Sequence, residues 1–234
     1  MGQAFFTLSI GMGSIAIFGS YIDKKHALTS EAVRVTVLDT SVALIAGLII
    51  FPACFTFGIQ PDSGPNLIFV TLPNVFAAIP GGRIWGFLFF VFLLFAALST
   101  VIAVFENIIS CWMDMLGWSR KKAVLVSWGL ILVLSVPCVL GFNLLSGFQP
   151  LGAGSTIMDL EDFLVSNNVL PLGSLVLALF CCNRFGWGWD NFVAEANTGR
   201  GLKVRPWMKP IFKYFVPGAI LFIYIYGMVT FHWR

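Results

Sequence analysis

The chain has 234 residues, of which 58% are hydrophobic and only 11% are charged. Ordinary soluble domains carry roughly a quarter charged residues, so this composition excludes a soluble globular chain. The formal net charge of +3 is too small to indicate a nucleic-acid partner. The five cysteines form no CxxC pair and lie away from both histidines, which argues against a zinc site or a disulfide framework. The composition therefore predicts a polytopic helical membrane protein.

Six apolar stretches approach the length needed to cross a bilayer, whose core of about 30 Å takes roughly 20 helical residues. They cover residues 4–21, 35–57, 85–116, 123–145, 163–185 and 214–231. The runs are continuous rather than alternating, so we predict helices, an all-α fold and a single transmembrane domain over residues 1–234. The third stretch is longer than one crossing requires, and its polar end predicts that it projects into water.

The basic residues set the expected orientation. The first, third and fifth connections hold 12 of the 14 lysines and arginines. These are Lys24, Lys25, Arg34, Arg120, Lys121, Lys122, Arg184, Arg200, Lys203, Arg205, Lys209 and Lys213. The positive-inside rule places these connections in the cytoplasm and both ends of the chain outside. Because the first stretch lacks the basic region of a signal peptide, we expect an odd number of further spans upstream.

Prolines interrupt the outer connection at residues 61–82. Pro61, Pro65, Pro73 and Pro80 bound two apolar pieces that are each too short to cross the membrane. Proline breaks at these positions predict two short helices that form an extracellular lid or a re-entrant hairpin. A structured surface loop is the alternative.

The first stretch contains two glycines and three hydroxyls within the eight residues from Thr7 to Ser14. These residues weaken a helix, and unwound backbone at membrane depth is tolerated only where it is packed in protein or lines a cavity. Such a break exposes carbonyls and half-helix ends that bind ions and charged substrates. Close helix packing through small residues is the alternative.

Two isolated carboxylates, Asp39 and Glu106, lie within apolar stretches. A carboxylate in the membrane is costly and often marks an ion or proton site. For Glu106 a structural hydrogen-bonding role is favoured, whereas for Asp39 both interpretations stay open. Ser99 and Thr100 place adjacent hydroxyls in the third stretch. Hydroxyl oxygens suit a hard monovalent cation, although Ser and Thr also commonly bond the backbone four residues back.

An acidic cluster lies at the outer mouth of the fifth stretch. It consists of Asp159, Glu161 and Asp162. The cluster predicts either an external gate or a solvated acidic surface.

Taken together, these motifs resemble one known family. The sequence GQAFFTLSIGMG, the run Asp39-Thr40-Ser41 that leads to AGLIIFP, the motif FAALST and the junction WSRK are similar to the bacterial neurotransmitter:sodium symporters, amino-acid transporters with the leucine-transporter fold. The resemblance covers the whole chain and implies that it corresponds to the family's transmembrane helices six to eleven. It implies the second inverted repeat of that fold plus one extra helix, with the first helix broken mid-membrane. The implied location is the plasma membrane, as a multi-pass protein of the bacterial inner membrane.

The resemblance also implies roles for single residues. The substrate-site positions are Phe6, Ser9, Met12, Ser99 and Val104. The positions for sodium are Thr7, Asp39, Ala96, Ser99 and Thr100, with Thr7 at the first ion and the last three at the second. The extracellular gate positions are Phe6, which closes over the substrate, and Asp162.

Asp39 departs from part of the family pattern. Chloride-dependent members have Asn at this position, and a nearby Ser where this chain has Ala43. A fixed carboxylate supplies the negative charge that chloride otherwise brings. The resemblance therefore implies chloride-independent transport.

The function implied is sodium-coupled symport of an amino acid by alternating access. The apolar Phe6, Met12 and Val104 favour an apolar or aromatic substrate, with sodium as the co-transported ion, no organic cofactor and no nucleic acid. The family's first five helices are absent from this sequence. We therefore expect a fragment that is inactive alone, with the N-terminal half as a same-chain or split partner.

The main alternative to symport is a membrane interaction or scaffold half-protein, or a nonfunctional remnant. A channel is weaker, because no selectivity-filter-like loop is visible. An enzyme is not expected, because the spans contain no Ser/His/Asp or metal-binding spacing.

Overall fold

The computed structural model describes residues 2–56, 67–152 and 154–230 of the chain. Over these ranges the chain forms helices and a single isolated bridge between His26 and Arg200, with no strand. The all-α class that we predicted is confirmed. Five helical segments are long and apolar enough to cross a membrane. They are Leu28–Thr56, Gly82–Leu116, Arg120–Leu140, Ile157–Cys182 and Pro206–Thr230.

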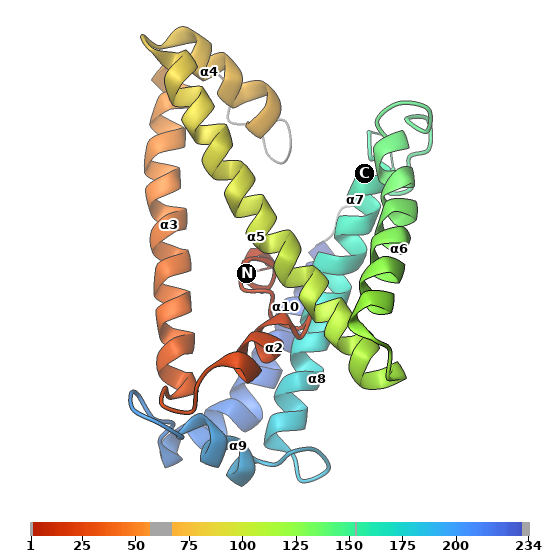
Figure 1. Cartoon of the computed structure of the whole chain (residues 1–234). Helices are drawn as coiled ribbons and strands as arrows, with labels where there is room; N and C mark the ends of the chain where they lie inside the picture. The colour runs from red at the N-terminus through yellow and green to blue at the C-terminus, as the bar shows by residue number, and fades with distance from the viewer. Residues whose placement is uncertain (1, 57–66, 153, 231–234) are drawn as a thin grey trace. The chain divides into compact units, whose positions relative to one another are not determined.

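Figure 1 shows the helices in chain order. The α-helices are α1 (Gly2–Thr7), α2 (Ser14–Tyr21), α3 (Leu28–Thr56), α4 (Leu72–Ala78), α5 (Gly82–Leu116), α6 (Arg120–Leu140), α7 (Ile157–Asp162), α8 (Leu170–Cys182), α9 (Trp189–Ala196) and α10 (Val216–Thr230). Shorter π and 3₁₀ segments are η1 (Leu67–Thr71), η2 (Phe163–Val169), η3 (Pro206–Met208) and η4 (Ile211–Phe215). Segment η1 leads into α4, η2 joins α7 to α8, and η3 and η4 lead into α10.

Several helices extend beyond the apolar stretches that predicted them. Helix α3 begins at Leu28 rather than at residue 35, and its added turns carry the ion pair between Arg34 and Glu31. The last membrane-length segment begins at Pro206 rather than at residue 214. Hydropathy marks only the part of a helix that lies in lipid, whereas hydrogen bonding continues into polar residues.

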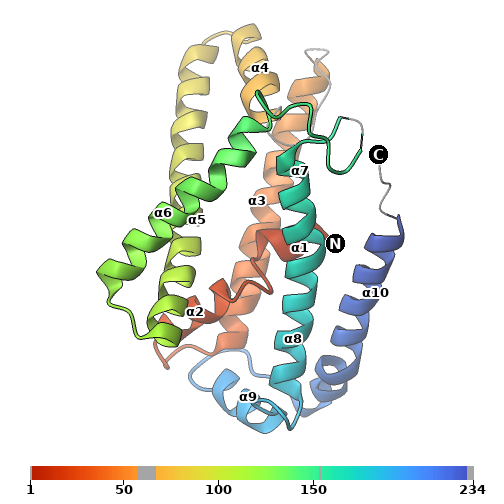
Figure 2. The same ribbon diagram turned by 90° about the vertical axis from the view of Figure 1, so that its right-hand side faces the viewer.

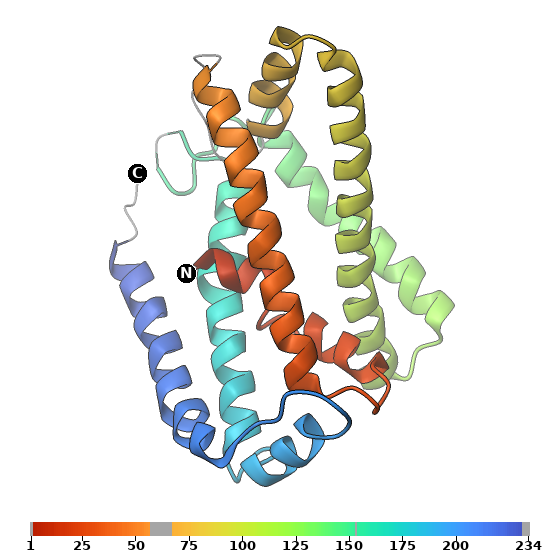
Figure 3. The ribbon, with the colours of Figure 1, turned by 90° about the vertical axis from the view of Figure 1, so that its left-hand side faces the viewer.

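The outer connection contains one helical segment where we expected a break. The helix runs through Leu67–Ala78 and continues across Pro73. Pro73 lies in the first turn of α4, a position where a missing N–H is tolerated. Residues 61–66 of the expected lid lie outside the described residues. Figure 3 shows α4 turning back beside the start of α5, where the rings of Phe76 and Phe89 are 5.4 Å apart.

Contacts within the chain divide it into two compact units. The first is Met1–Arg34 with Val104–Arg234, and the second is Val35–Ala103. In the first unit α8 and α10 run side by side in opposite directions, and α1 lies against η2 and α8 (Figure 2). The core at this crossing is a cluster of Phe5, Leu170 and Ile220.

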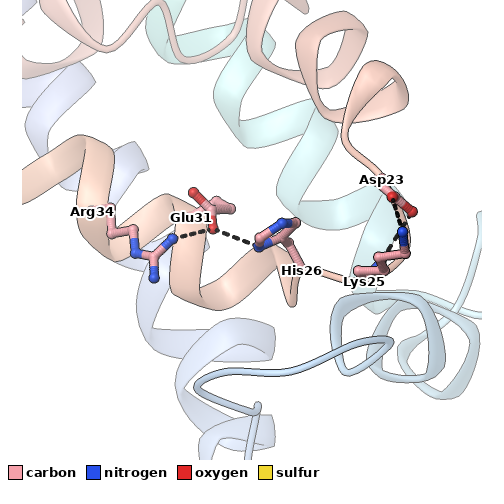
Figure 4. A network of polar contacts seen from close by, with 5 residues as sticks. All are labelled: Asp23, Lys25, His26, Glu31 and Arg34. Atoms are coloured by element: carbon pink, nitrogen blue, oxygen red, sulfur yellow. Dashed lines mark hydrogen bonds and ion pairs between the residues drawn. The ribbon is translucent and has the colours of Figure 1, made fainter.

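The connection from α2 to α3 is held by polar contacts (Figure 4). Glu31 accepts a 2.7 Å hydrogen bond from Arg34 and lies 3.7 Å from His26, while Lys25 pairs with Asp23 at 3.4 Å. The backbone of this connection also bonds to Arg200, whose N–H donates to the Lys25 carbonyl at 2.9 Å. The connection is therefore ordered by its own charges and by the segment that follows α9.

Candidate functional site

The first apolar stretch is a broken helix. Helix α1 ends at Thr7 and α2 begins at Ser14, and the chain between them is unwound. Ser9, Gly11 and Gly13 have φ angles of 49°, 95° and 82°. Residues other than glycine rarely adopt this left-handed region, so Ser9 marks a backbone that the surrounding structure enforces. The predicted break is confirmed.

The unwound segment packs directly against the η2–α8 junction. A Cβ at Gly11 would overlap the carbonyl oxygen of Leu170 and lie 2.8 Å from the Ser174 nitrogen. A Cβ at Gly173 would in turn overlap the carbonyl of Gly11. Leu170 is fully buried. Close packing through small residues, the alternative to a break, therefore occurs together with the break, and glycine at positions 11 and 173 permits it.

Two adjacent residues of α5 hold the two ends of α2. The Asn107 side-chain amide donates a 2.9 Å hydrogen bond to the Met12 carbonyl, just before α2 begins. The Tyr21 hydroxyl, on the last residue of α2, donates to Glu106 at 3.0 Å. A half-helix that starts mid-membrane is thus fixed at both ends by polar groups of one neighbouring helix.

Glu106 is the centre of a small ionic cluster. Arg120, at the start of α6, donates two hydrogen bonds to it, at 3.0 and 2.6 Å to the two carboxylate oxygens. The carboxylate side chain is 18% exposed and the arginine 58%. A bidentate pair of this kind fixes geometry as well as charge. The contacts support the structural role that we favoured for Glu106, because its oxygens already bond Tyr21 and Arg120.

The predicted residues of the first unit are distributed around the break. Phe6 is 49% exposed, whereas its neighbour Phe5 is buried in the core. Thr7 is exposed at the end of α1, and Ser9 and Val104 are half-buried.

Met12 packs on the core cluster and lines an apolar hollow of about 480 Å³. The hollow's other lining residues come from the part of α5 beyond Glu106, including Asn107, Trp112 and Met115. Phe6, Ser9 and Val104 are not among the described residues that line it. The structure thus brings Met12 together with the C-terminal half of α5 rather than with the other predicted substrate positions.

The acidic cluster before the fifth stretch has two different structural roles. Asp159 closes a capping box at the start of α7, where its carboxylate accepts from the Thr156 N–H at 2.7 Å. Asp162 is exposed and accepts a 2.7 Å hydrogen bond from the Ser166 hydroxyl. Asp159 is thus a helix cap, and Asp162 is available at the surface.

In the second unit the predicted cation ligands lie on two helices. Ser99 and Thr100 are exposed on α5, and both hydroxyls donate to the Ala96 carbonyl, at 2.8 and 3.1 Å. Asp39 is half-buried on α3, and within the described ranges its carboxylate has no hydrogen-bond or ion-pair partner. The next residue, Thr40, donates to the Thr36 carbonyl at 2.8 Å. These oxygens are present on their helices, and their hydroxyls bond only within the same helix.

One buried hydroxyl at the break is unsatisfied. Ser14, the first residue of α2, is 4% exposed, and its Oγ has no hydrogen-bond partner over the part of the chain that the structure describes. A buried hydroxyl without a partner costs about 1–3 kcal/mol. This position therefore favours a polar group supplied from outside the described chain.

The comparisons with known proteins agree with this geometry. The Sodium:neurotransmitter symporter family matches residues 1–233. The chain belongs to this family. Its sequence is 34% identical to an uncharacterized sodium-dependent transporter of Bacillus subtilis, YhdH, over 96% of this chain and 49% of that protein. It is 28% identical to sodium-dependent nutrient amino acid transporter 1 of Drosophila melanogaster, over 97% of this chain and 35% of that protein.

A solved symporter structure has the same fold. The crystal structure of MhsT in complex with L-phenylalanine matches with a TM-score of 0.84 and 39% identity, over 96% of this chain and 50% of that chain. The resemblance to the leucine-transporter fold is confirmed. The chain spans about half the length of the Bacillus subtilis relative and of the MhsT chain. These relatives are membrane transporters rather than enzymes.

Several residues that shape the break and its surroundings were not singled out as site residues from the sequence. Asn107 and Gly173 position the break, and Arg120 pairs with Glu106. An amide directly after Glu106 in an apolar span was a usable signal, because a polar side chain there needs a partner. Gly173 gave no such signal, since many membrane helices contain glycine.

Proposed function

We propose that this chain is the C-terminal half of a sodium-coupled amino-acid symporter. The observation that carries the proposal is the unwound segment between α1 and α2, which is fixed by Gly11, Gly173 and Asn107. Half-helix ends and unwound carbonyls at membrane depth form ion and substrate sites in transporters of this kind. Close packing alone does not require a left-handed serine or a buried, unsatisfied Ser14 hydroxyl.

In this proposal Thr7, Asp39, Ala96, Ser99 and Thr100 are sodium ligands, with Thr7 at the first ion and the last three residues at the second. Sodium is a hard cation that prefers carbonyl, hydroxyl and carboxylate oxygens. Ser99 and Thr100 support this role because their oxygens face the surface of α5 and keep free lone pairs while donating to Ala96.

The proposed substrate is an apolar or aromatic amino acid. Phe6, Ser9, Met12, Ser99 and Val104 form this half of its site, and Phe6 with Asp162 forms the outer gate. The half-exposed aromatic ring of Phe6 and the apolar side chain of Met12 support the choice of substrate. The bound L-phenylalanine of the MhsT structure supports it by similarity.

The proposed partner is a polypeptide that supplies the first five helices, in the same chain or as a separate one. Without it the chain should not transport. The orphan Ser14 hydroxyl and the exposed apolar faces of α3 and α5 support this partner. The proposed location is the plasma membrane.

The test is sodium-dependent binding of radiolabelled L-phenylalanine. We would join this chain to the half of MhsT that it does not cover, and compare the joined protein with the 234-residue chain alone in proteoliposomes. The joined protein should bind the ligand only with sodium, and the chain alone should not bind it. The variant Thr7→Val should abolish binding, whereas the control Thr198→Val, which removes a hydroxyl near α9, should not. Equal binding by the Thr7→Val variant would contradict the sodium assignment.

Asp39 carries the proposal that transport is independent of chloride. The wild-type joined protein should take up substrate equally in chloride and gluconate buffers, because the carboxylate supplies the negative charge beside sodium. The variant Asp39→Asn should lower uptake or make it depend on chloride. If uptake by Asp39→Asn is unchanged and still insensitive to chloride, then the Asp39 carboxylate does not replace chloride.

A further inference from the structure

The segment between α8 and α10 connects two helical segments that are long enough to cross a membrane, so we assign it to a membrane surface. It joins two membrane-length segments, Ile157–Cys182 and Pro206–Thr230, whose adjoining ends are in contact through α8 and η4. Helix α9 lies beside the end of α8 (Figure 2). The connection is rich in lysine and arginine, so the positive-inside rule assigns it to the cytoplasmic face. Trp187 and Trp207 are 40% and 61% exposed there, as is typical of side chains at a lipid headgroup layer.

A pocket of about 470 Å³ opens between α9 and the start of η3. This volume lies within the range of about 300–1,000 Å³ usual for ligand sites. Its apolar wall comes from Trp189, Val193 and Val204, of which Trp189 and Val204 belong to a buried cluster. The Asn197 side chain bonds the Val204 backbone twice, accepting at 2.6 Å and donating at 3.1 Å. The pocket is therefore preformed by α9 and by the chain segment that links α9 to η3.

The polar side of this pocket is basic. Arg205 and Lys209 line it together with one carboxylate, Asp190, which leaves a net positive charge. Over the described ranges neither Arg205 nor Lys209 forms an ion pair with an acidic side chain. Two cations beside an indole ring at the membrane surface provide donors for a phosphate group.

An apolar hollow of about 630 Å³ begins on the next turn of the same segment. Its lining residues are Pro210, Ile211, Tyr214 and Phe215. Tyr214 and Phe215 are 68% and 71% exposed. Along the sequence, the basic pocket is followed directly by an apolar hollow. This combination matches a molecule with an anionic head and a hydrocarbon chain, whereas a soluble phosphate compound has no hydrocarbon chain to bury in the hollow.

We propose that this pocket binds the phosphate headgroup of an anionic glycerophospholipid. Arg205 and Lys209 bind the phosphate, Trp189 packs against the glycerol, and an acyl chain lies along Ile211, Tyr214 and Phe215. The site is separate from the substrate and sodium positions. It would fix α9 and the start of the last membrane helix to the bilayer surface.

The test is native mass spectrometry of the 234-residue chain, titrated in detergent with phosphatidylglycerol or phosphatidylcholine of identical acyl chains. The chain should bind phosphatidylglycerol about tenfold more tightly, because each basic group near an anionic headgroup contributes several-fold. The double variant Arg205→Gln/Lys209→Gln should lose this preference. The matched control Arg184→Gln/Lys203→Gln removes the same charge from the same connection but outside the pocket, and should keep the preference within about twofold.

Three outcomes would overturn the proposal. Equal loss in the two double variants would show that diffuse charge attracts the lipid without a built site. Equal binding of the two lipids by the wild-type chain would show that the protein does not recognise the charge of the headgroup. Displacement of phosphatidylglycerol by millimolar glycerol phosphate would assign the pocket to a soluble phosphate compound. The milder variant Arg205→Lys, which keeps the charge, should retain most of the preference.

Discussion

The two units of this chain hold their predicted functional residues in different ways. In the first unit the unwound segment is fixed by contacts from distant parts of the chain, through Gly173, Leu170 and Asn107. In the second unit the hydroxyls of Ser99 and Thr100 bond only to a carbonyl of their own helix. In the most apolar 18-residue stretches of α3 and α5, only 6% and 0% of the residues are buried.

This difference shows which half of the proposed site is prepared by the chain itself. The break is preorganised, because its backbone geometry is imposed by packing and does not depend on a ligand. The predicted positions on the other two helices are the half-buried Asp39 of α3 and the exposed Ser99 and Thr100 of α5. In our proposal they become ligands only when another element or an ion completes the coordination. Substitutions at the packed positions of the break, such as Gly11 and Asn107, should therefore change folding. Substitutions of the exposed hydroxyls of Ser99 and Thr100 in the second unit should instead change only ion binding.

The largest effect is expected for Gly11→Ala. Its Cβ would overlap a backbone carbonyl, so overpacking of about 1–3 kcal/mol adds to about 1–2 kcal/mol for the left-handed conformation. Gly13→Ala is the matched control, because Gly13 also has positive φ but its added Cβ would lie 3.6 Å from its nearest neighbour. Thermal unfolding of the detergent-solubilised chain should show a much larger loss for Gly11→Ala. Equal losses would mean that the close approach to Leu170 does not stabilise the fold.

A smaller loss is expected for Asn107→Ala. It removes the hydrogen bond to the Met12 carbonyl and should lower the free energy of unfolding by about 1–2 kcal/mol. In the second unit, the exposed Asn74 donates a similar 2.9 Å bond to the Val70 carbonyl, but only within its own helical segment. Asn74→Ala should therefore cost no more than about 0.5 kcal/mol. The same unfolding measurement compares the two variants. An equal loss of unfolding free energy in Asn107→Ala and Asn74→Ala would contradict the difference between the units.

The smallest effect on stability is expected for Ser99→Ala and Thr100→Val. Both hydroxyls are exposed and satisfied locally, so each change should alter the free energy of unfolding by less than about 0.5 kcal/mol. In the joined protein the same variants should raise the sodium concentration needed for half-maximal L-phenylalanine binding. If they instead destabilise the chain and leave the sodium dependence unchanged, these hydroxyls are structural.

Most of the architecture could be predicted from composition alone. Long uncharged runs leave no soluble alternative, and continuous apolar residues exclude alternating strands, so helices followed directly. The break in the first stretch was one of two interpretations, because glycines and hydroxyls signal both unwinding and close packing. The structure shows both at once, since Gly11 is left-handed and also touches Leu170. The continuity across Pro73 was not predictable, because proline is tolerated in a first turn that only the structure locates.

The sequence by itself determined that the chain is helical, that it lies in a membrane, and which residues carry oxygen ligands, because these follow from residue chemistry and period. Only the tertiary structure decided which of them are held in place. Asn107 reaches Met12 across 95 positions of sequence, and Arg120 reaches Glu106 from the next helix. Such partners depend on how helices pack, and a pattern of apolar residues specifies that a helix is buried in lipid without specifying which neighbour its few polar groups will meet.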